Sequence, residues 1–215
     1  MPVTARKFAV PAILMLLAGG CSTTGEIDET GGITAIRSAC PTVAVPAGTG
    51  DITLFDPPAS RTAAAIDVAA VLTNVRSTCA DATDDIVTTV SFDIQARRAA
   101  FDAPRDVDFP YFITVVRGGS AVIAKRVGHV TVHFNAGQDR ASASGQATST
   151  ISRAAATLSD DVRKKLTEKR KAGGSDAAVD PLTRPEIRQA VLRATFEALV
   201  GFQLTDDQLK YNATR

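Results

Sequence analysis

Two histidines are the residues whose spacing first points to metal chemistry in this 215-residue chain. His129 and His133 lie four positions apart, and on an α-helix that spacing lets both imidazoles bind one metal ion. The Val-Thr-Val between them is typical of a strand instead. On a strand, positions four apart lie about 13 Å from each other at ~3.3 Å per residue, too far to share one ion. We therefore expect two polar residues on a solvent-exposed strand face and no metal site.

Pairs of acidic residues are the other groups that could take part in acid–base chemistry. They are Asp84–Asp85, Asp160–Asp161 and Asp206–Asp207. The last two pairs are expected in the first turns of helices, where carboxylates complement the helix dipole. The chain contains no G-x-S-x-G, P-loop, G-x-G-x-x-G or H-E-x-x-H motif. We therefore predict no catalytic residue, no cofactor and a protein that is not an enzyme.

The composition argues against nucleic acid as a partner. The chain has 24 basic and 23 acidic residues, a formal net charge of +1, no Trp and 5% aromatic residues. It therefore has neither a basic excess to attract phosphate backbones nor many aromatic rings on which bases could stack. Hydrophobic residues make up 45% of the chain, which is ordinary for a protein that buries a core.

The N-terminus has the three parts of an export signal. Arg6 and Lys7 form a short basic region, residues 8–17 are almost entirely apolar, and small residues occupy positions 18–20. The apolar run is too short to cross a bilayer core of about 30 Å as a helix. This order of parts is typical of a signal peptide that is removed on export.

The run Leu17-Ala-Gly-Gly-Cys21 resembles the bacterial lipobox, although Ala18 stands where leucine is usual. The resemblance implies that Cys21 is acylated, with palmitate among its acyl chains, and becomes the mature N-terminus of a membrane-anchored lipoprotein. Similarity to Gram-negative lipoproteins further implies the outer membrane and a domain that faces the periplasm, because Ser22 stands where aspartate would mark retention in the inner membrane. The alternative is an ordinary secretory signal in which Cys21 is incidental.

Cys40 and Cys79 are the cysteines that remain once Cys21 is acylated. Because exported proteins enter an oxidising compartment, we predict a disulfide between them. On the chain-entropy model, closing a loop of about 40 residues stabilises a fold by about 4 kcal/mol. The alternatives are two buried free thiols or a reactive pair, and the chain offers no C-x-x-C motif for the latter.

The elements that would position these residues begin with a series of strands. A polar stretch over 21–32 is expected to be a flexible tether. Beyond it, apolar alternation between turn signals predicts strands at 52–55, 64–77, 85–97, 111–117, 120–125, 129–134 and 140–151. The sharpest signal is the hairpin around Gly118-Gly119, because two glycines can take the positive φ angles of a tight turn.

The apolar spacing becomes helical after about residue 156. It predicts a solvated helix, or a segment that becomes ordered on binding, over 160–171. It further predicts the best-defined helix over 184–200 and a short helix that starts at Thr205. The 184–200 helix would begin with a capping box of Thr183 and Glu186. Its broad apolar face includes Leu192, Phe196 and Leu199.

These patterns predict a mainly β protein, specifically an antiparallel immunoglobulin-like β-sandwich with appended C-terminal helices. The expected organisation is a signal peptide over 1–20, a lipidated N-terminus and tether over 21–32, the sandwich over 33–155 and a helical segment over 156–215.

With an anchor, a tether and no catalytic set, the expected function is that of a non-enzymatic envelope lipoprotein. It would contact the membrane through its lipid and bind another cell-envelope component, a protein. The alternative is a carrier or assembly factor for an apolar ligand such as a lipid. That function would require an enclosed apolar cavity with a few polar groups at its mouth.

Overall fold

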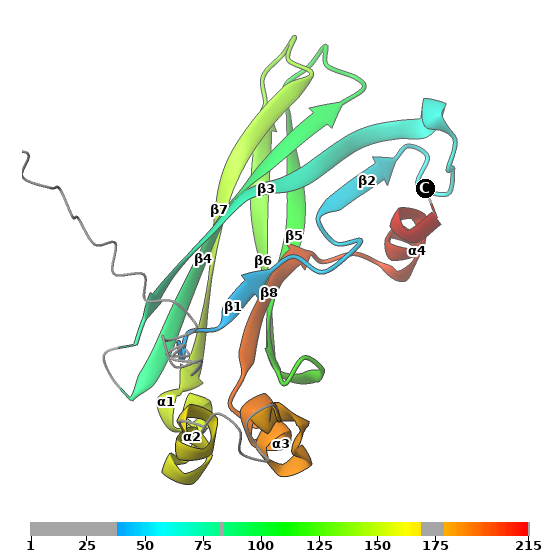
Figure 1. Ribbon diagram of the computed structural model, residues 1–215. Helices are drawn as coiled ribbons and strands as arrows, with labels where there is room; N and C mark the ends of the chain where they lie inside the picture. The colour runs from blue at the N-terminus through cyan, green and yellow to red at the C-terminus, as the bar shows by residue number, and fades with distance from the viewer. Residues whose placement is uncertain (1–37, 82–83, 169–178, 215) are drawn as a thin grey trace, which may run out of the picture.

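The computed structural model describes residues 38–81, 84–168 and 179–214, which form two four-stranded β-sheets (Figure 1). The first sheet has the strand order β1 (Thr42–Ala44), β8 (Phe196–Phe202), β5 (Arg105–Arg117) and β6 (Ala121–Phe134). The second has the order β2 (Asp51–Phe55), β3 (Ile66–Ala80), β4 (Asp85–Arg98) and β7 (Arg140–Ser152). Neighbouring strands are antiparallel, except that β1 and β8 are parallel. The prediction of a mainly β fold is confirmed.

The hairpin predicted around Gly118-Gly119 joins β5 to β6. Both glycines have positive φ angles, 60° and 79°, which a tight hairpin turn requires and which other residues rarely adopt. The sequence predicted two separate strands over 120–125 and 129–134, whereas β6 runs without a break through Gly128. The glycine is needed inside the strand because a Cβ there would lie 2.6 Å from the ring of Tyr111.

Strand β8 corrects the prediction of a helix over 184–200. Helix α3 (Pro185–Arg193) ends well before Val200, and a strand begins at Phe196. Phe196, Ala198 and Val200 are buried at alternate positions, as in a strand with one face in the core. A short apolar run fits both the helical and the strand period. Residues 196–202 form a strand because they pair with β1 on one side and with β5 on the other.

The remaining helices are short. They are η1 (Ala63–Ala65), α1 (Arg153–Ala156), α2 (Asp160–Thr167), η2 (Pro181–Thr183) and α4 (Asp206–Thr214). The helix predicted over 160–171 corresponds to α2, which ends at Thr167. Positions 169–171 of the predicted helix lie outside the described residues. The capping box predicted for Thr183 and Glu186 is wrong: η2 and α3 divide this segment, and α3 starts at Pro185 with no side-chain cap. In the described parts of the chain, no helix is long and apolar enough to span a membrane.

The two sheets share one apolar core. Four phenylalanines are almost fully buried in it: Phe92 on β4, Phe109 on β5, Phe134 on β6 and Phe202 on β8. Ring contacts join neighbours in this core, with the centroids of Phe109 and Phe202 5.9 Å apart and those of Phe92 and Tyr111 5.0 Å apart. The second sheet is curled, because β3 bends strongly along its length (Figure 1).

A second, smaller core cluster contains Ile86, Val115, Ile151 and Phe196, and Cys40 packs against it. Cys40 forms a disulfide with Cys79, with the two Cα atoms 6.1 Å apart. The predicted disulfide is therefore present.

Candidate interaction site

The outer face of the β5–β6 pair is polar at one end and apolar at the other. Alternate residues of a strand point to opposite sides of its sheet, and Val107, Phe109 and Ile113 of β5 enter the core. The intervening residues of β5 and their register partners on β6 therefore share the outer side. From one end to the other the pairs are Asp106–His133, Asp108–Thr131, Pro110–His129, Phe112–Val127, Thr114–Lys125 and Val116–Val122.

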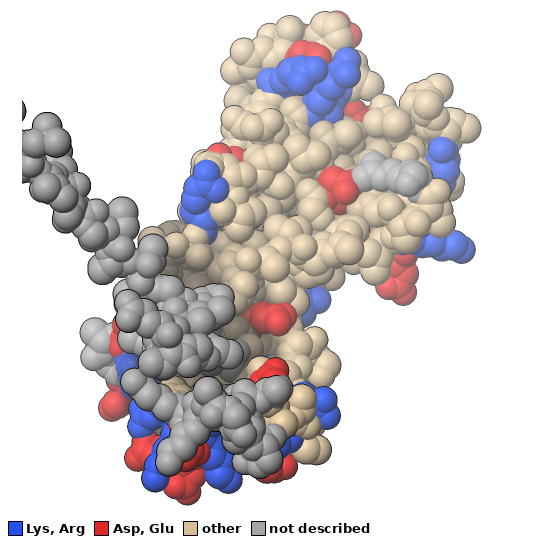
Figure 2. Space-filling model, in the orientation of Figure 1, with Lys and Arg blue, Asp and Glu red and all other residues tan. Residues whose placement is uncertain are grey.

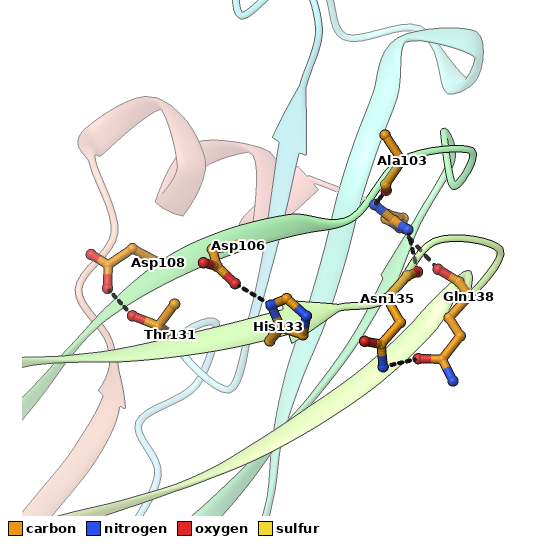
Figure 3. Close-up of polar contacts among 8 residues, drawn as sticks. Ala103, Asp106, Asp108, Thr131, His133, Asn135 and Gln138 are labelled. Atoms are coloured by element: carbon orange, nitrogen blue, oxygen red, sulfur yellow. Dashed lines mark hydrogen bonds and ion pairs between the residues drawn. The ribbon is translucent and has the colours of Figure 1, made fainter.

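One end of this outer face is polar. The Nδ1 atom of His133 lies 2.6 Å from Oδ1 of Asp106 (Figure 3). The Nδ1 atom of His129 lies 2.6 Å from Oδ2 of Asp108. Thr131 donates a longer hydrogen bond, 3.4 Å, to Asp108 between them. The prediction of two exposed histidines on a strand face is confirmed, and each has a carboxylate of its own on the neighbouring strand. Cross-strand pairs of this kind add a few tenths to about 1 kcal/mol each to sheet stability.

The two histidine–aspartate pairs do not form a metal centre by themselves. Within the ranges that the structure describes, no group of three or more His, Cys, Asp or Glu side chains is placed to hold a metal ion. The acid pairs Asp160–Asp161 and Asp206–Asp207 lie in the first turns of α2 and α4, as predicted.

At the other end, the β6 half of the outer face is apolar and open to solvent, whereas Thr114 and Val116 on β5 are buried. Every residue over 121–127 is exposed, including Val122 at 64%, Ile123 at 50% and Val127 at 52%. A register shift pairs Val115 with Ala124 and Val116 with Val122, so Ile123 is the extra residue of a bulge. Among the described residues, these large apolar side chains stay at least half exposed, which is unusual for a folded surface.

Among the described strands, β6 is also the last strand of its sheet and is hydrogen-bonded to β5 alone. We call residues 121–127 the β6 edge. An edge strand presents N–H and C=O groups to which another extended chain can add, and charged side chains commonly discourage unwanted pairing there. Lys125 and Arg126 supply those charges, and the ammonium group of Lys125 lies 5.2 Å from the ring centroid of Phe112. The strand prediction found this segment, whereas its position at a sheet edge depends on the whole topology.

At the opposite end of the β5–β6 pair, an arginine that sequence reasoning missed fixes two loops. Arg98 is only 3% exposed and donates hydrogen bonds to four backbone carbonyls, those of Phe101, Ala103, Asn135 and Gln138. Figure 3 shows Ala103, Asn135 and Gln138 converging from the two loops. The guanidinium also stacks 5.0 Å from the ring centroid of Phe134. The alternation of β4 is the signal that could have found it, because Arg98 has the parity of the buried Ile94, whereas Arg97 has the parity of the outer face and is exposed.

The outer face of the second sheet carries a different polar contact. Asp93 accepts hydrogen bonds from the Asn74 amide and the Ser144 hydroxyl, both at 2.8 Å. These two bonds, that from Asn74 first, hold the pKa of Asp93 below its ordinary value because they stabilise the charged carboxylate. Asn74 takes a positive φ of 51°, which Asn tolerates better than most residues, at an irregularity in β3.

No protein-family model matches this chain, and comparison with curated proteins gives no significant match. Cys21, the residue on which the lipobox resemblance depends, lies outside the described residues, and its acylation stays a prediction. The proposed function is therefore argued from the chemistry of the described surfaces.

Proposed function

We propose that this protein is a non-enzymatic envelope lipoprotein that binds another protein of the cell envelope through the β6 edge. Acyl chains on Cys21 hold it on the outer membrane, facing the periplasm, and an immunoglobulin-like β-sandwich presents the edge. The single observation that carries the proposal is the exposure of 121–127 on an edge strand with three large apolar side chains, Val122, Ile123 and Val127.

An extended segment of the partner would add to β6 as a further strand. Main-chain hydrogen bonds to the edge would supply much of the affinity, and the side chains that alternate along β6 would supply specificity. Val127 and Phe112 lie opposite each other and offer apolar contact beside Lys125. Lys125 and Arg126 favour a partner with acidic residues between apolar ones, since like charges across a strand pair are destabilising. The same two charges oppose pairing of β6 with a second copy of itself.

The packing of the core favours this contact function over the carriage of an apolar ligand. A carrier needs an enclosed apolar cavity, whereas the described apolar side chains of the two sheets pack against one another. Phe92, Phe109, Phe134 and Phe202, the largest of them, meet at this interface and are almost fully buried.

A photo-crosslinking amino acid placed at Val127 of the full chain tests the proposal in cells. The expected result is a discrete adduct with one envelope protein. The same amino acid at Thr148, an exposed position on β7, is the matched control and should give no such adduct.

Charge reversal then tests the chemistry of the edge. K125E/R126E should abolish the adduct at Val127, because the acidic partner would be repelled. K164E/K165E reverses two charges on α2 and should leave the adduct intact. An adduct that forms equally at Thr148, or one that survives K125E/R126E unchanged, would contradict the proposal.

A further inference from the structure

A second candidate site lies on the outer face of the other sheet, away from the β6 edge. An open depression of about 530 Å³ extends over β3, β4 and β7, and its lining includes Ala69, Val71, Gln95, Arg97, Arg140 and Ser142. These residues form two cross-strand rows, because Ala69 pairs with Arg97 and Arg97 with Arg140, while Val71 pairs with Gln95 and Gln95 with Ser142.

The charges of this depression are not balanced. Arg97 and Arg140 are directly opposite on antiparallel strands, an arrangement in which like charges destabilise the pair. One carboxylate lies near both: Oδ2 of Asp139 is 3.4 Å from Nε of Arg97 and 4.0 Å from Nε of Arg140. The nearby Arg105 is already occupied by a two-bond contact with Asp67. One positive charge in the depression therefore remains without a counter-charge among the described residues.

The side chains next to the two arginines add neutral hydrogen-bonding groups. Gln95 carries an amide and Ser142 a hydroxyl, and in the described part of the chain neither side chain has a hydrogen-bond partner. Positively charged side chains lie at this end of the molecule, over the end of β4 and the start of β7, with acidic side chains beside them (Figure 2). The depression thus combines two guanidinium groups with further hydrogen-bond donors. Ala69 and Val71 form its apolar floor, and the side chain of Val71 is exposed.

We propose that this depression binds a phosphate monoester group. A phosphate has three terminal oxygens and can accept bonds from both guanidiniums and from a neighbouring amide or hydroxyl, whereas a carboxylate has only two oxygens. The depression is larger than a phosphate ion needs, and the apolar floor offers contact to the carbon part of an ester. This inference does not depend on the β6 edge, because the two surfaces lie on different sheets.

The test is a titration of the purified full-length protein with glycerol 3-phosphate, followed by the NMR signals of the arginine Nε–H groups. Shifts confined to Arg97 and Arg140 are expected, with a dissociation constant on the order of 1 mM for so open a site. R97Q/R140Q should weaken binding by about tenfold or more, since it removes both charge-assisted contacts. D139N should strengthen binding, because it removes the competing carboxylate. R76Q changes an arginine of β3 that lies outside the depression, and it should leave binding unchanged.

Two further ligands test whether the site prefers phosphate to carboxylate and whether the phosphate belongs to a lipid or to a soluble ester. Acetate should bind more weakly than glycerol 3-phosphate, and equal binding would overturn the assignment to phosphate. Dihexanoyl phosphatidic acid binding more tightly than glycerol 3-phosphate would identify a lipid headgroup as the source, and equal binding would identify a soluble phosphate ester. Binding that is absent, or that persists in R97Q/R140Q, would overturn the proposal.

Discussion

Cys40 and Cys79 are joined by a disulfide that links the segment before β1 in the first sheet to the end of β3 in the second. The bond closes a loop of 39 positions. It connects the two sheets beside the smaller core cluster, where Cys40 packs against Ile86 and Phe196 among others.

Replacement of both cysteines by alanine should lower the free energy of unfolding by about 4 kcal/mol, because the unfolded chain regains the entropy of that loop. Urea unfolding of the double variant and of the oxidised protein measures the difference. Alkylation of the unreduced, denatured protein is the control and should label neither cysteine. Equal stability of the two proteins would contradict the expectation.

Replacement of Arg98 by methionine should destabilise the protein by about 3 kcal/mol, because it removes the buried donor that holds four loop carbonyls. Those carbonyls belong to the loops on either side of β5 and β6. Thermal or urea unfolding gives the value. Arg97→Met removes an exposed arginine one residue earlier and should change stability by about 0.5 kcal/mol or less; similar losses for both variants would show that Arg98 has no special role.

Replacement of Phe202 by alanine should cost about 3 to 5 kcal/mol, because the ring is fully buried in β8 and leaves a cavity. Leu192 on α3 is 38% exposed, so Leu192→Ala should cost about 1 kcal/mol or less. Chemical denaturation of both variants tests the finding that β8, rather than a long helix, completes the first sheet. A larger loss for Leu192→Ala than for Phe202→Ala would contradict it.

Replacement of Asn74 by alanine should raise the pKa of Asp93 toward its ordinary value of 3.8, because the hydrogen bond that lowers this pKa most is lost. In the unmodified protein the pKa is depressed in the folded state. The contact therefore contributes stability above the unfolded-state pKa, and that contribution is lost as the pH falls through the folded-state pKa. A carbon-13 NMR titration of the Asp93 carboxyl group measures the change. Ser144→Ala should produce a shift in the same direction but smaller, and an unchanged pKa in both variants would refute the cause assigned here.

Replacement of Cys21 by serine should leave the protein unprocessed or wrongly located, because the acylated residue would be absent. Fractionation of cells into membrane and soluble parts tests this, with Cys40→Ser as a control that keeps the lipobox. A Cys21→Ser protein that is cleaved and partitions into the membrane as before would refute the lipoprotein assignment.

The sequence by itself was enough for the features that depend on local chemistry. Alternating apolar residues located β4, residues 111–117 of β5 and the strand around His129 and His133, and the paired glycines located the β5–β6 turn. The short helix predicted to start at Thr205 forms, and Thr205 and Gln208 cap it through two reciprocal hydrogen bonds. These signals are local, because side-chain alternation, positive φ and helix capping each involve only a few neighbouring residues.

Only the tertiary structure decided the features that depend on distant parts of the chain. The apolar run from Phe196 suits a helix or a strand, and β1 and β5 select the strand by hydrogen-bonding to its two sides. Arg97 and Arg98 are neighbours of the same type, yet loops from far along the chain surround Arg98 and leave Arg97 to face Arg140. Edge position and cross-strand partners are properties of the assembled sheets, so no window of sequence around a residue contains them.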